Sequence, residues 1–355
     1  MPPSAHEPAF MILNSYAILD AFVTLLRGLA GLLVVVLGLF AWWKGRGLLT
    51  PESRKSLEDR GTLLFLLSFL LVTLNLVSWP LLYLLLQSYV PEWPGVMCIY
   101  GVTQIGVGSI GPTRFLPNLL EILEFTKPLL VFAGGGWFVL YLINRRTATA
   151  PLHNHIITGI IGLGALAILD ASVETAYLTI PKKEKFLAAG CCTEVFDTQG
   201  QSRFLPNALF QEDHRWLLYA AYYGINGCLI VALFAGRWLN AAAYPVVLGL
   251  LLLIAILAAA ASGIFLIEIA SPILLHQPYH HCPYDLVPRV PESVLAVALF
   301  LWGTFALGWS WVAVWFGRYQ ETEAFLSQVV RQMMLMACWS YLASLVMMSM
   351  EIALA

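Results

Sequence analysis

Eight long apolar segments limit what this chain can fold into more than any other feature of the sequence. A helix needs about 20 mostly apolar residues to cross the hydrocarbon core of a bilayer. The segments lie near residues 15–42, 62–90, 127–144, 155–180, 216–236, 242–270, 292–316 and 328–352. Only 11% of the 355 residues are charged, whereas a soluble domain carries roughly 25%. The sequence therefore predicts an all-α, polytopic membrane protein with about eight transmembrane helices and the lipid bilayer as its main partner.

The chain contains no low-complexity segment and no long linker, so we expect residues 1–355 to form a single transmembrane domain. Its first residues, MPPSAHEPAF, lack the basic region and cleavage site of a signal peptide, which makes the first apolar segment an expected anchor. We place the protein in the cell inner (plasma) membrane. The net charge of −2 and the lack of a basic, aromatic-rich tract exclude nucleic acid as an expected partner.

The distribution of positive charge predicts the orientation. Nine of the 19 arginine and lysine residues lie in the short links, namely Lys44, Arg46, Arg54, Lys55, Arg60, Arg145, Arg146, Arg237 and Arg318, and positive charge is sparser per residue in the longer loops. Positive residues in short loops mark the cytoplasmic side. Both termini and the longer loops at 91–126, 181–215 and 271–291 are then extracytoplasmic. Lys182, Lys183 and Lys185 argue against this orientation, because they lie in the second long loop.

A repeated phrase links the first two long loops. Arg-Phe-Leu-Pro-Asn occurs at 114–118 and again at 203–207, and Cys98 and Cys191 occupy matching positions upstream. The match suggests a duplicated helix–loop–helix unit, around 62–144 and 155–236. A simpler explanation covers the phrase alone: proline and asparagine favour a helix start, and Phe-Leu seats that start at the lipid headgroups. The simpler explanation leaves the cysteines unexplained.

Four of the six cysteines fall in the predicted extracytoplasmic loops, which we expect to form a Cys/His-rich cap. They are Cys98, Cys191, Cys192 and Cys282, and His276, His280 and His281 accompany the last of them. Three interpretations remain open. The first is a pair of disulfides, with Cys191 joined to Cys98 and Cys192 joined to Cys282. The second is a site for Cu(I) or Zn²⁺ formed by Cys98, Cys191, Cys192, His280, His281 and Cys282, because thiolate and imidazole suit these metals. The third is thiol–disulfide exchange, although the Cys-x-x-Cys pair that lowers a thiol pKa does not occur.

Several ionisable residues lie within the apolar segments, where such groups mark function by default. Asp20 and Arg27 share one face of the first helix, and Asp170 and Glu174 share one face of the fourth. Two interpretations of Asp170 and Glu174 stay open, a polar cavity or cation path and an ion pair with Arg27. Glu268 is expected near the end of the sixth helix, at the membrane interface.

The sequence contains no Walker, Gly-x-Ser-x-Gly or His-Glu-x-x-His motif, so an enzyme is not the expectation. No haem b is expected, because the seven histidines fall at helix ends or in loops. Our leading hypothesis is a membrane protein that handles a soft metal ion, copper above all, at its extracytoplasmic face. It would act as a carrier or as the membrane component of a larger assembly, with other membrane subunits or a soluble ATPase as partners. The alternative is a non-catalytic subunit or scaffold with a disulfide-stapled cap, and a membrane thiol–disulfide oxidoreductase comes third.

Overall fold

The computed structural model describes residues 14–44, 51–93, 96–109, 111–147, 149–182, 215–238 and 244–355. Every long element in this part of the chain is a helix, and the described residues contain no β-strand. Eight helices are long and apolar enough to cross a membrane. The predicted all-helical, eight-span architecture is therefore confirmed. The described chain divides into two compact units, which we take in turn.

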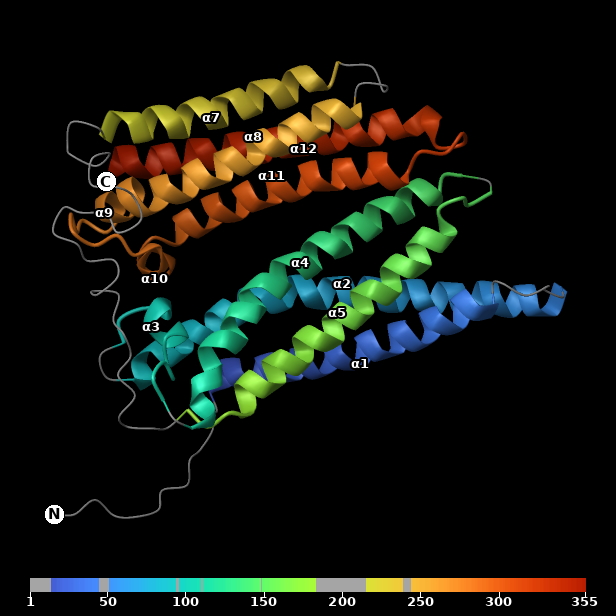
Figure 1. Ribbon diagram of the computed structural model, residues 1–355, viewed down its shortest axis with the longest axis horizontal. Helices are drawn as coiled ribbons and strands as arrows, with labels where there is room; N and C mark the ends of the chain where they lie inside the picture. The colour runs from blue at the N-terminus through green and yellow to red at the C-terminus, as the bar shows by residue number, and fades with distance from the viewer. Residues whose placement is uncertain are drawn as a thin grey trace, which may run out of the picture. The chain divides into compact units, whose positions relative to one another are not determined.

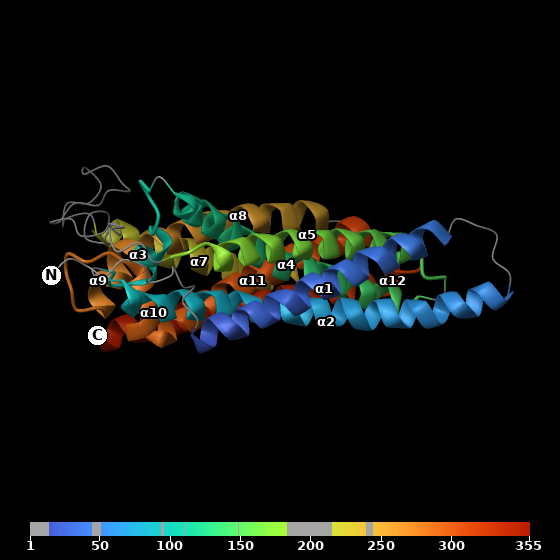
Figure 2. The same cartoon turned by 90° about the horizontal axis from the view of Figure 1, so that it is seen from below.

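Unit 1 comprises the described residues up to Trp137 and those from His153 to Lys182. Its long helices are α1 (Ser15–Lys44), α2 (Pro51–Tyr89), α5 (His153–Thr179) and the first part of α4 (Leu116–Asn144). Short helices η1 (Val90–Glu92), α3 (Ile99–Thr103) and η2 (Pro112–Phe115) connect α2 to α4. Helix α1 packs along both α2 and α5, as Figure 1 shows in blue and green. Figure 2 shows the same α1 and α2 running side by side from the turned view.

Glycine allows α1 and α5 to approach closely. A Cβ atom added to Gly164 in α5 would lie 2.9 Å from Val35 Cγ2 and 3.0 Å from the Gly31 carbonyl oxygen of α1. Small residues at helix contacts let backbones approach each other in membranes. Gly162, two residues earlier on the same helix, faces open space instead. The close contact fixes which face of α5 is turned toward α1.

Helix α2 presents a mixed face to the interior of unit 1. Its buried positions Leu71, Asn75, Ser78, Leu82 and Leu85 follow one another at intervals of three and four residues. This spacing places them on one face of the helix. The buried face of α2 thus brings an amide and a hydroxyl into an otherwise apolar helix contact.

Unit 2 contains the described residues from Phe138 to Leu152 and from Arg215 to Ala355. Its long helices are α7 (Arg215–Gly236), α8 (Tyr244–Phe265), α11 (Pro291–Phe316) and α12 (Glu323–Leu354). Helix α8 continues through a π-helical turn, η6 (Leu266–Ala270), into α9 (Ser271–Leu274), and η7 (Pro283–Asp285) and α10 (Leu286–Arg289) precede α11. Tyr222 of α7 and Phe265 of α8 stack with ring centroids 4.0 Å apart, which joins these two helices in the core.

The third membrane span begins before the apolar run near 127–144, as a helix start at Pro117-Asn118 predicts. It covers Pro112–Asn144 rather than 127–144. Glu121, Glu124 and Lys127 interrupt the apolar run in this region, so hydropathy alone ends the segment too soon. The consequence is that Lys127 lies well inside the span and not at its edge.

The predicted duplication does not coincide with the two units. Helix α5 belongs to unit 1 and α7 to unit 2, whereas the second predicted repeat, 155–236, includes both. The second copy of the Arg-Phe-Leu-Pro-Asn phrase, at 203–207, and Cys191 lie outside the described residues. The duplication therefore stays a prediction.

Candidate functional site: an intramembrane charge network

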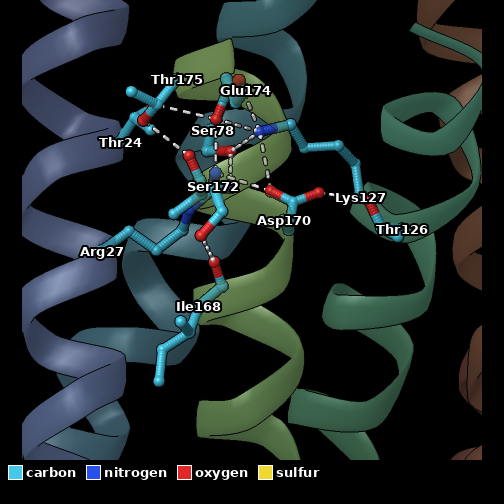
Figure 3. A network of polar contacts seen from close by, with 11 residues as sticks. Thr24, Arg27, Ser78, Thr126, Lys127, Ile168, Asp170, Ser172, Glu174 and Thr175 are labelled. Atoms are coloured by element: carbon cyan, nitrogen blue, oxygen red, sulfur yellow. Dashed lines mark hydrogen bonds and ion pairs between the residues drawn. The ribbon is translucent and has the colours of Figure 1, made fainter. Parts of the chain in front are cut away.

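Four charged side chains meet inside unit 1, and we call them the charge network: Arg27, Lys127, Asp170 and Glu174. They come from α1, α4 and α5, and each is fully buried. Figure 3 shows them turned toward one another between the three helices. Asp170 and Glu174 lie four residues apart, which places both carboxylates on the same face of α5. The network thus lies within membrane-spanning helices on every side.

Each cation of the network contacts both anions. Arg27 Nη2 lies 2.6 Å from Asp170 Oδ2 and also pairs with Glu174. Lys127 Nζ lies 2.7 Å from Glu174 Oε1 and 3.2 Å from Asp170 Oδ2. Two positive charges therefore balance two negative charges inside the helix bundle.

Three hydroxyl groups complete the network. Ser78 Oγ of α2 accepts hydrogen bonds from Arg27 and from Lys127 Nζ, the second at 2.6 Å. Thr24 donates to Glu174 Oε2 at 2.7 Å, and Thr126 donates to Asp170 Oδ1. Buried ions lose several kcal/mol of hydration each, which only good pairing and further hydrogen bonds offset. The hydroxyls supply those further bonds.

Two buried polar side chains beside the network lack such bonds. Among the described residues, neither carboxylate oxygen of Asp20 has a hydrogen-bond partner, and neither does the amide group of Asn75. Asp20 lies one helical turn before Thr24 on α1, and Asn75 lies one turn before Ser78 on α2. Helices α1 and α2 run in opposite directions (Figure 1). The polar interior therefore extends beyond the network toward both ends of unit 1.

Three of the residues that the sequence singled out inside the membrane, Arg27, Asp170 and Glu174, meet in this site. Asp20 lies beside the network, and Glu268 belongs to unit 2. Asp170 and Arg27 form the ion pair that was one of the two open interpretations. The sequence analysis did not include Lys127 among the intramembrane charges, because Lys127 is the first residue of the apolar segment 127–144. The helix start at Pro117-Asn118 was the available signal, since it places Lys127 about ten residues into a helix.

A lysine near the end of α5 has an altered acidity. Lys182 Nζ donates to the carbonyl oxygen of Tyr177 at 2.5 Å and lies 4.3 Å from the centre of the Tyr177 ring. The ring of Tyr89 is 5.8 Å away. Burial lowers the pKa of Lys182 from its usual 10.5 to about 8, because the charged form loses hydration. Lys182 therefore changes charge within an accessible pH range.

The cysteines of the predicted cap have different environments. Cys98, directly before α3, is buried and disulfide-bonded. Cys191 and Cys192, its expected neighbours, lie outside the described residues. Cys282 is buried. Its predicted bridge to Cys192 involves a residue outside the described part of the chain and stays a prediction.

The histidines beside Cys282 contact carboxylates. His280 Nε2 lies 3.0 Å from Asp285 Oδ2. His281 Nδ1 lies 3.6 Å from Glu268 Oε2, and Glu268 belongs to the π-helical turn of α8. Within the described part of the chain, no group of three His, Cys, Asp or Glu side chains is arranged to hold a metal ion. The predicted copper or zinc site, two of whose ligands are Cys191 and Cys192, stays a prediction.

No family model, curated protein or solved structure matches the chain. Any function must therefore be argued from the site itself. The charge network offers groups that bind, donate and accept protons, held by helices that span the membrane. Such an arrangement can hold charge inside the bilayer and can redistribute it among neighbouring groups.

Proposed function

We propose that the protein is a membrane carrier that moves protons across the bilayer, and that the charge network lies on their path. The observation that carries this proposal is the burial of Arg27, Lys127, Asp170 and Glu174 within membrane-spanning helices. Ionisable groups inside spans mark ion pathways and proton relays. The unpartnered groups of Asp20 and Asn75 support it further, because they extend the polar interior in both directions.

The main alternative is a scaffold or subunit whose network serves only to hold helices together. Apolar side chains of similar volume often replace buried ion pairs without loss of stability, and sometimes with a gain. Helix packing in unit 1 also has an independent basis in the close contact of Gly31 with Gly164. Stability alone therefore does not require four buried charges, which favours a role in transport.

The soft-metal function belongs to a different part of the molecule. The charge network contains no thiolate or imidazole, and its two cations would repel a metal ion. Copper or zinc handling therefore depends on the predicted extracytoplasmic loops, where Cys191 and Cys192 lie. Metal analysis of the purified protein, with and without replacement of both cysteines by serine, tests that hypothesis separately.

Proton movement can be measured on the purified protein in liposomes that contain a pH-sensitive dye, with a potassium diffusion potential as the driving force. We expect flux well above that of protein-free liposomes. Glu174→Gln should lower this flux by about tenfold or more, because a carboxyl group that accepts protons is lost. Glu351→Gln, which changes an acid in α12 of unit 2, should leave the flux within about twofold.

A charge-balanced variant shows whether a loss of flux comes from misfolding or from the loss of the proton-accepting group. Glu174→Gln combined with Lys127→Met removes one charge of each sign, so the remaining Arg27 and Asp170 still pair. We expect this variant to keep a cooperative thermal transition and to lose flux. Full flux in the balanced variant, or wild-type flux no higher than in protein-free liposomes, would favour the scaffold alternative.

A further inference from the structure

Asp20 has no role in the ion pairs described above, although it is fully buried in the same unit. Neither of its carboxylate oxygens has a hydrogen-bond partner among the described residues. It shares a face of α1 with Thr24 and Arg27. The charged and titratable groups that act on it electrostatically are Arg27 of its own helix, Tyr89 of α2, Lys127 of α4, and Asp170, Glu174 and Tyr177 of α5.

The charges around Asp20 do not need a third carboxylate. Arg27 and Lys127 are already balanced by Asp170 and Glu174, each cation touching both anions. An ionised Asp20 would add one negative charge with no counter-charge in direct contact. An uncompensated buried ion is strongly unfavourable, and such a group becomes neutral instead. A single proton on Asp20 restores the balance.

A proton fits this position better than a metal cation does. Cations such as Ca²⁺ and Mg²⁺ require about six or more oxygen ligands. Neither oxygen of Asp20 has a hydrogen-bond partner in the described structure, so Asp20 is not part of a set of oxygen ligands. A proton needs no further ligand, because it binds covalently to one carboxyl oxygen.

We propose that Asp20 is a proton-binding site that holds one proton at rest and exchanges it with Glu174 through the hydroxyl of Thr24. Thr24 follows Asp20 by one helical turn and donates to Glu174 Oε2 at 2.7 Å. A hydroxyl donates one proton and accepts others, so it can relay. The Asp20 carboxyl, which makes no hydrogen bond at rest, must first rotate to reach Thr24 Oγ1. Its proton then passes to Thr24 Oγ1 while the original Thr24 proton passes to Glu174 Oε2. Asp20 becomes a carboxylate, Glu174 becomes a neutral acid, Thr24 is unchanged, and no electrons are transferred.

The exchange gives the network two charge states. With Glu174 ionised, Arg27 and Lys127 each contact two carboxylates. With Glu174 neutral, Arg27 and Lys127 share Asp170 as their only charged partner within the network. The new carboxylate at Asp20 then attracts Arg27, which belongs to the same helix, α1. The position of one proton therefore decides which carboxylates hold the two cations.

Infrared spectroscopy tests the proton on Asp20 directly, because a protonated carboxyl group has a C=O stretching band that a carboxylate lacks. The protein is measured in lipid nanodiscs at neutral pH. We expect a band that Asp20→Asn removes and that Asp20→Glu shifts. Asp285→Asn, which alters an acid paired with His280 and Arg289 in unit 2, should leave the band in place. A spectrum that is identical in wild type and Asp20→Asn would overturn the proposal.

A stability measurement checks the same point independently. The amide of asparagine is neutral and nearly isosteric with a protonated carboxyl group, so Asp20→Asn should unfold at nearly the wild-type temperature. A large shift of that temperature in either direction would contradict a neutral Asp20.

The relay rests on the proposed transport function, but the proton site does not. Thr24→Val should keep the Asp20 band and lower proton flux in liposomes. Wild type with the band but without flux would refute the transport function and retain the site. Flux without an Asp20 band would refute the site and retain the transport function. Undiminished flux in Thr24→Val would remove Thr24 from the path.

Discussion

Single residues near the end of α5 show how burial alters acid–base behaviour in this protein. Lys182 lies just after the membrane span, with Tyr177 and Tyr89 around its ammonium group. Carbonyl oxygens and ring faces stabilise the charge in part. They do not replace the lost hydration, so the pKa of Lys182 falls to about 8. The folded protein therefore releases this proton more readily than the unfolded chain does.

The lowered pKa of Lys182 predicts a pH dependence with a definite sign. Between about pH 8 and 10.5 the folded state binds fewer protons than the unfolded state, so stability rises with pH. Below about pH 8 Lys182 is charged in both the folded and the unfolded state, so burying its charge lowers the free energy of unfolding by the full amount. Lys182→Met has no ammonium group, so its stability lacks this pH dependence. The stability of wild type relative to Lys182→Met should therefore increase by roughly 2–3 kcal/mol from pH 7 to 10. Thermal unfolding of both proteins across this range measures it, and a difference that stays flat would disprove it.

Whole helices determine where the charge network can form. Gly31 and Gly164 bring α1 and α5 together, and this contact turns Asp170 and Glu174 toward Arg27. Helix α4 adds Lys127, and α2 adds Ser78. The network is thus a product of four helices that pack in one arrangement.

Glycine substitutions test that packing. Gly164→Ala should lower the free energy of unfolding by about 1–3 kcal/mol, because the added methyl group meets backbone and Val35 at about 3 Å. Gly162→Ala is the matched control: it lies two residues away on the same helix and its methyl group would meet nothing within 4 Å. It should be neutral or slightly stabilising, since alanine is the better helix former. Equal effects of the two substitutions would exclude a special role for the Gly31–Gly164 contact.

The same helices show what the sequence could and could not reveal. Hydropathy finds the spans because lipid demands long apolar runs, and helical spacing pairs Asp170 with Glu174. Lys127 escapes such reasoning, because its burial depends on partners from other helices. The contacts of His280 and His281 with Asp285 and Glu268 escape it for the same reason. Local patterns predict elements, whereas charge pairing across elements is decided by packing.

At the scale of the whole molecule, Cys98 bears on the orientation. Disulfides persist in oxidising compartments and are rare in the cytosol, and Cys98 is disulfide-bonded. The lysines and arginines of the short links independently predict a cytoplasmic location for those links. Both arguments predict an extracytoplasmic location for the segment between α2 and α4.

Labelling with a membrane-impermeant maleimide tests this orientation. A variant whose only cysteine replaces the exposed Met97, next to Cys98, should react in right-side-out vesicles and not in inside-out vesicles. The control replaces Thr147, in the short link between α4 and α5, with cysteine in a chain that has no other. It should react only in inside-out vesicles. The reverse pattern would invert the whole topology.

The separation of network partners along the chain has a consequence for how the protein is made. Arg27 and Glu174 are 147 residues apart. Synthesis proceeds at about 5–20 residues per second, so α1 leaves the ribosome roughly 7–30 seconds before its carboxylate partners exist. During that interval its arginine has no counter-charge in the hydrocarbon. We therefore expect the charge network, and with it the packing of unit 1, to form only after α5 has been made.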